Sequence, residues 1–108
     1  MVYLVGGYKL TRDQVLQWCR PRGLDPPDGN VTLDVNDWLR THNIAQTRLL
    51  SCTYHAETIY LVVTNRRIDR NATRDNFMPF AESENARRIK ELVGLGDIEF
   101  VTVPNPYG

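Results

Sequence analysis

The chain has 108 residues, 42% hydrophobic and 24% charged, a balance typical of one soluble globular domain spanning residues 1–108. Thirteen basic residues offset thirteen acidic ones, so long-range attraction to nucleic acid or to an anionic membrane is not expected. No apolar run approaches the roughly 20 residues of a membrane span, and the N-terminal run lacks a signal peptide's basic region. We therefore expect a cytoplasmic protein.

The first elements are a strand and a helix. Apolar β formers predict a strand over residues 2–8, and the pair Gly6-Gly7 at its end predicts a bulge or a close backbone approach. Thr11 and Gln14 fit a capping box, so a helix is expected to begin there. Pro21 should end this helix, because the residue before a proline is pushed out of the α region.

A loop and a second helix come next. Proline and Asp-Gly turn signals cluster in residues 20–31, which predicts a surface connection. Either Thr32 or Asp34 can cap the helix that follows, whose apolar face includes Trp38. Asn43 is predicted to end this helix in the left-handed conformation.

A β-hairpin is the clearest element of the chain. Two β-rich runs, 49–54 and 58–65, flank a short polar turn around His55-Ala56-Glu57. The second run is almost wholly apolar, which suits a central strand covered on both faces.

The C-terminal third begins with a long connection over residues 65–82, a length often associated with function. Three apolar residues near its end are expected to pack on the core: Phe77, Met78 and Phe80. Ser83 should cap a helix that Gly94 ends, with an apolar stripe of Ala86, Ile89, Leu92 and Val93. A last strand is predicted over residues 98–103.

This element order, β-α-α-β-β-α-β, predicts an α+β fold of the ferredoxin-like split βαβ type. Its four-stranded antiparallel sheet would carry the helices on one face. The order resembles that of the dimeric α+β barrel proteins, and this likeness of plan implies two subunits that pack sheet to sheet.

Strand alternation assigns side chains to the two faces of the predicted sheet. With Ile59, Leu61 and Val63 against the helices, the open face would carry a set of largely apolar residues: Tyr3, Val5, Tyr60, Val62, Val101 and Val103. So apolar a face marks an interface or a ligand groove when it is exposed. Two explanations are open: the long connection or the C-terminal tail covers it, or a homodimer buries it and encloses a ligand cleft.

Candidate chemistry is sparse. Cys52 and His55 are three residues apart, but four ligands are usual in a structural metal site, and odd spacing in a strand separates the two faces. We expect no metal and no cofactor, and we expect Cys19 and Cys52 to be buried free thiols, since two cysteines make no disulfide framework. Seven of the thirteen basic residues fall within residues 66–90, as either an anion site or a network of loop salt bridges.

The sequence favours a small binding or interaction protein, homodimeric through the open face. Its predicted ligand site combines Tyr3, His55 and Tyr60 with Arg66 and Arg67 at the rim. Two alternatives stay open. One is a cofactor-independent enzyme of isomerase or oxygenase type in the same cleft, and the other is nucleic-acid or anion binding through the Arg66–Arg74 loop.

Overall fold

The computed structural model describes residues 1–25, 31–44 and 47–106. Its elements follow in chain order: β1 (Val2–Leu10), α1 (Arg12–Cys19), the 3₁₀ turn η1 (Arg20–Arg22), α2 (Val31–Thr41), β2 (Leu49–Tyr54), β3 (Glu57–Asp69), α3 (Glu84–Val93) and β4 (Phe100–Pro104). The fold is α+β, with a four-stranded antiparallel sheet.

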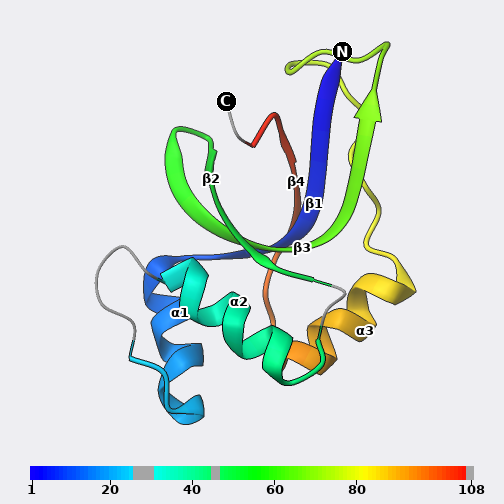
Figure 1. The fold of residues 1–108 in the computed structure, drawn as a ribbon. Coiled ribbons are helices and arrows are strands. Elements are labelled where there is room, and N and C mark those ends of the chain that lie inside the picture. The colour runs from blue at the N-terminus through cyan, green and yellow to red at the C-terminus, as the bar shows by residue number, and fades with distance from the viewer. Residues whose placement is uncertain (26–30, 45–46, 107–108) are drawn as a thin grey trace.

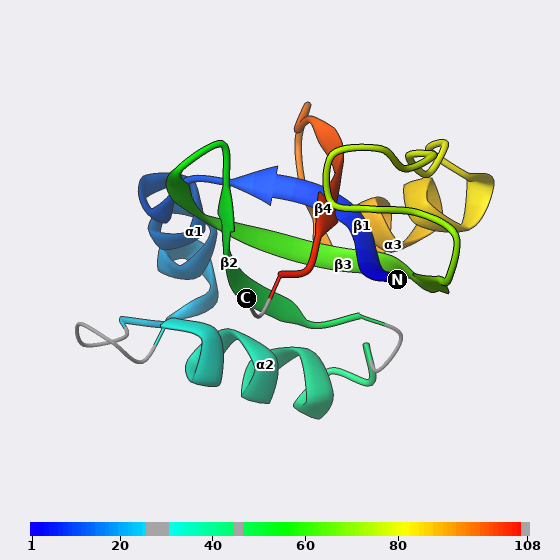
Figure 2. The ribbon, with the colours of Figure 1, turned by 90° about the horizontal axis from the view of Figure 1, so that it is seen from above.

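The strands are ordered β2-β3-β1-β4, so β2 and β4 form the two edges of the sheet. Figure 1 shows that the sheet is strongly curved: β3 bends into a U, with the β2–β3 hairpin on one arm and β1 and β4 on the other. The three α-helices lie on the convex side. Figure 2 looks into the concave side from above.

A β-bulge lies where the sheet curves. Gly6 of β1 is opposite Asn65 of β3, but Gly7 is opposite Val63, so β3 has one extra residue at this point. A Cβ atom on Gly7 would lie 2.1 Å from the carbonyl oxygen of Val62, within the backbone of the neighbouring strand. Gly6-Gly7 therefore combines the bulge and the close approach that the sequence predicted.

The face assignment predicted for the hairpin is wrong. Ile59, Leu61 and Val63 do not face the helices but lie on the concave face, in a buried cluster with Val5 and Val103. The alternate residues of β3, Tyr60 and Val62, pack instead against the helix core. Period-two alternation shows which residues share a face, but when both faces are apolar it does not show which face the helices cover.

Three clusters of buried side chains stabilise the fold. The largest lies between the helices and the sheet and includes Tyr8, Leu39 and Ile89. The second fills the concave face. In the third, Ala72, Phe77 and Phe80 from the segment before α3 cover Val2 and Leu4 of β1, on the helix side of the sheet.

The apolar centre of the concave face is buried within a single chain. Leu61 and Val103 have no exposed surface and Val5 has 1%. Beyond β4 the backbone turns at Asn105, whose φ is 45°, and the buried Pro106 follows. In Figures 1 and 2 this end of the chain turns from β4 toward the β2–β3 hairpin. The curvature of the sheet and this turn thus cover the face that the sequence left open.

Local signals in the sequence predicted the helix ends well. Thr11 forms the full capping box, Ser83 caps α3, and Gly94 ends α3 with a φ of 81°. Asn43 has the predicted left-handed backbone, with a φ of 60°.

Other local predictions are wrong or lie outside the described residues. Helix α2 already includes Val31, ahead of the predicted caps, and the proline-rich part of the preceding loop, 26–30, is outside the described residues. Leu92 and Met78, both predicted to pack, are 53% and 73% exposed. Strand β3 continues to Asp69, so the long connection is shorter than predicted. In the described part of the chain, no helix is long and apolar enough to cross a membrane.

Candidate functional site: a cleft beside the free edge of β4

A cleft of about 700 Å³ lies beside β4, and we call it the β4 cleft. Three parts of the chain line it: the end of the β2–β3 hairpin, the segment before α3, and β4 with the residue that precedes it. The lining residues are 53–56, 74–77, 79–80, 99–102 and 104. The cleft thus brings together segments far apart in the sequence.

The floor of the β4 cleft is a sheet edge. The amide of Lys9 donates to the carbonyl of Glu99 at 2.9 Å, and the amide of Asn105 donates to the carbonyl of Tyr3 at 2.7 Å. Hydrogen-bonded and non-hydrogen-bonded pairs alternate along an antiparallel ladder. The odd-numbered residues of β4 therefore bond to β1, and the backbone groups of Phe100 and Thr102 point away from β1, toward the free edge.

One wall of the cleft is formed by Phe77 and Phe80. Both rings pack on the cluster around Leu4, and the Phe80 amide donates to Thr102 Oγ1 at 2.9 Å. The guanidinium of Arg67 lies 4.8 Å from the centre of the Phe80 ring and donates to the Met78 carbonyl at 2.5 Å. These contacts hold the aromatic wall against the sheet.

The opposite wall is the tip of the hairpin. His55 and Ala56 form a two-residue turn with φ angles of 49° and 63°, the left-handed pair that a type I′ turn requires. The ammonium of Lys9 lies 5.5 Å from the centre of the Tyr54 ring and 3.6 Å from a Glu99 carboxylate oxygen. Lys9 thereby links the hairpin tip to the start of β4.

The five residues predicted as a ligand site do not come together. His55 lines the β4 cleft, but Tyr60 packs on the opposite, helix-covered face of the sheet. Tyr3 packs against the concave cluster. Neighbouring Arg66 and Arg67 point to opposite faces of β3: Arg66 is exposed, and Arg67 lies beneath Phe80.

Sequence reasoning missed the aromatic wall and the edge of β4. Phe77 and Phe80 were predicted to pack on the core, and they do, but no local pattern indicates that they also line a cleft. Thr102 had no distinguishing signal at all. Its role depends on which strand forms the edge of the sheet, and that is a property of long-range pairing.

The His, Arg, Asp and Glu side chains that line the cleft are exposed: His55, Arg74, Asp75 and Glu99. Catalytic acids and bases usually have a pKa that burial or a charged neighbour has displaced. Burial raises the pKa of Tyr8, Cys19 and Cys52, and none of these three residues lines the cleft. Both cysteines are buried free thiols, as predicted.

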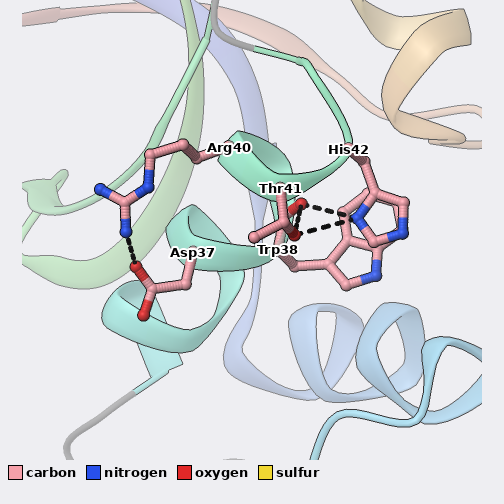
Figure 3. Close-up of polar contacts among 5 residues, drawn as sticks. All are labelled: Asp37, Trp38, Arg40, Thr41 and His42. Carbon is pink, nitrogen blue, oxygen red and sulfur yellow. Dashed lines mark hydrogen bonds and ion pairs between the residues drawn. The ribbon is translucent and has the colours of Figure 1, made fainter.

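A second cluster of aromatic side chains lies at the C-terminal end of α2 (Figure 3). The His42 ring stacks on Trp38, with ring centres 3.8 Å apart, and His42 Nδ1 lies 2.8 Å from the Trp38 carbonyl. Trp38 meets Trp18 edge to face. Arg40 and Asp37 form an ion pair on the opposite side of the helix. These contacts close the end of α2.

No family model, no curated protein and no solved structure matches this chain. Within the described residues, no group of three or more His, Cys, Asp and Glu side chains is placed to hold a metal ion.

Proposed function

We propose that this protein is a small binding protein whose ligand occupies the β4 cleft. One observation carries the proposal: the cleft is large, about 700 Å³, with one wall held by packing and a hydrogen bond to Thr102 and the other contacted by the ammonium of Lys9. Ligand sites in proteins are commonly clefts of roughly 300–1,000 Å³ with a few directed polar groups. The exposed state of the lining carboxylates and of His55 favours binding over acid–base catalysis.

We further propose that the fold belongs to the ferredoxin-like plan. The strand order β2-β3-β1-β4 with antiparallel neighbours is the arrangement that this plan requires. The predicted homodimer, in contrast, needs an exposed concave face. Leu61 and Val103 on that face are already buried in one chain, which favours a ligand in the β4 cleft over a second copy on the concave face.

A fragment screen tests the binding proposal. We would record ¹H–¹⁵N correlation spectra of the labelled protein with a library of fragment-sized compounds. We expect shifts to concentrate on the amides of residues 53–56, 74–77 and 99–102. Shifts that are absent, or that concentrate on the helices, would contradict the proposal.

A matched pair of variants assigns the binding to the cleft. Thr53 and Thr58 are exposed cross-strand partners in the hairpin, but only Thr53 lines the cleft. Thr53→Trp should fill part of the cleft and weaken fragment binding at least tenfold. Thr58→Trp should leave it unchanged, since it places the same ring outside the cleft. Equal effects of the two variants would remove the cleft as the site.

A further inference from the structure

We propose that the ligand of the β4 cleft is an extended polypeptide segment that pairs with β4 as a fifth strand. This inference rests on the proposed function and names the class of ligand. Alternation along the β1–β4 ladder directs the backbone groups of Phe100 and Thr102 to the free edge, and both residues line the cleft. An unpaired strand edge offers a row of donors and acceptors that fit another strand.

The size of the cleft fits one added strand. Five residues of β-strand extend about 16 Å, and strands are spaced by about 4.8 Å in sheets about 10 Å thick. Such a segment takes up roughly 800 Å³, close to the 700 Å³ of the cleft. Strand β4 has five residues, Phe100–Pro104, and its outward groups are the N–H and C=O of Phe100 and Thr102 and the C=O of Pro104, which has no N–H.

The walls of the cleft favour a single segment over a second folded copy. If the β4 edges of two copies paired directly, the cleft walls of one copy would collide with those of the other. Here the edge is recessed between the aromatic wall of Phe77 and Phe80 and the hairpin tip at His55. A lone extended chain can enter this space, whereas the edge of a second sheet brings its own walls with it.

The walls also predict the side chains of the segment. Alternate residues of an added strand point to opposite faces of the sheet. On the helix side they meet the rings of Phe80 and Phe100, so apolar or aromatic residues are expected at every second position. On the other side they meet Tyr54 and His55 at the hairpin tip. A proline at a position that must donate to β4 should be excluded.

The first test uses a displayed library of random linear octapeptides, selected against the intact protein. With a selected peptide bound, hydrogen exchange of the Phe100 and Thr102 amides should slow at least tenfold. The amides of Val101 and Val103 already point toward β1 and should change little. Protection without this alternation, or none at β4, would overturn strand addition.

A matched pair of substitutions removes the edge donor. Thr102→Pro and Thr102→Val both lose the hydroxyl that accepts from the Phe80 amide, but only proline also removes the outward N–H. Proline is tolerated on an edge strand where the nitrogen points away from the neighbouring strand, as that of Thr102 does although its side chain is buried. We expect Thr102→Pro to bind the selected peptide at least tenfold more weakly than Thr102→Val. Equal affinities would contradict the pairing.

A second measurement does not depend on any variant folding. Methylating the peptide amides one at a time should weaken binding at least tenfold at alternate positions, because only alternate amides face β4. A flat profile would overturn the inference. If fragments bind the cleft but no peptide is selected there, strand addition fails and the proposed function stands. If neither binds, both fail.

Discussion

The phenol of Tyr8 donates a hydrogen bond of 2.7 Å to Glu82 Oε2, and this bond joins β1 to the residue before the cap of α3. Tyr8 has no exposed surface, and Arg87 lies 3.7 Å from the other oxygen of Glu82. Burial, and then the bond to the Glu82 carboxylate, raise the pKa of Tyr8 well above its ordinary value. The folded state therefore holds the phenol proton more tightly than the unfolded chain does.

Tyr8→Phe should make this link visible in the pH dependence of stability. At pH 7 we expect the variant to lose about 1 kcal/mol of unfolding free energy with the hydrogen bond. Above about pH 10 the unfolded tyrosine loses its proton while the folded one keeps it, so the wild type should lose up to about 1.4 kcal/mol per pH unit through this group. The advantage of the wild type should therefore shrink as the pH rises.

Urea unfolding of both proteins between pH 7 and 11 measures this difference. The buried cysteines titrate in both proteins, so their contribution cancels when the two curves are subtracted. A difference that stays constant across this range would show that Tyr8 does not carry the expected proton linkage.

The two glycines of the β1 bulge should differ sharply in their tolerance of alanine. A Cβ on Gly7 would lie 2.1 Å from the Val62 carbonyl oxygen, and only movement of the backbone relieves that clash. A Cβ on Gly6 would meet the Phe80 ring at 2.7 Å, and a side chain can shift. We expect Gly7→Ala to cost at least about 3 kcal/mol of unfolding free energy and Gly6→Ala about 1 kcal/mol. Urea unfolding measures both free energies, and equal losses in the two variants would contradict this account of the bulge.

Signals within a few residues of one another predicted the helix ends. Thr11 and Gln14 specify a start and Gly94 a stop because caps are satisfied by local hydrogen bonds. The same reasoning placed the hairpin, whose turn is confirmed at His55 and Ala56.

Local signals missed those features of the fold that depend on pairing between strands far apart in the sequence. The polar run from Asn65 to Asp69 looks like a loop, yet it continues β3 because it pairs with Val2–Gly6 of β1. Tyr60 lies on the face of the sheet that the helices cover. The sequence of a strand that is apolar on both faces does not show which face that will be. The cleft depends on β4 being an edge, so neither Phe100 nor Thr102 could be identified from the sequence as part of a site.

The hairpin turn contains a residue that would be better as glycine. Ala56 has a φ of 63°, a backbone conformation that costs an L-residue roughly 1 kcal/mol. We expect Ala56→Gly to raise the unfolding free energy by about 0.5–1 kcal/mol, because glycine adopts this conformation without a steric cost. Ala86→Gly, inside α3 and fully buried, is the control and should lower it by about 1 kcal/mol or more. Denaturant melts measure both, and a destabilised Ala56→Gly would show that the turn is not strained.

Arg22 links the C-terminal end of α3 to that of α1 by hydrogen bonds. Its guanidinium donates to the Trp18 carbonyl at 2.7 Å and to the Val93 carbonyl at 3.1 Å, and it lies 4.1 Å from the centre of the Trp18 ring. The Trp18 indole N–H donates to the same Val93 carbonyl at 2.9 Å. Burial lowers the pKa of Arg22, but a guanidinium stays charged at neutral pH.

Replacing Arg22 with lysine should therefore cost stability although the charge is kept. An ammonium cannot stack on the Trp18 ring and donate to both carbonyls at once, so we expect Arg22→Lys to lower the unfolding free energy by about 2 kcal/mol. Arg20 is exposed in the same 3₁₀ turn, and Arg20→Lys should change it by less than about 0.5 kcal/mol. Urea unfolding at pH 7 separates the two. Equal losses would mean that the planar fork of Arg22 contributes nothing that a simple charge does not.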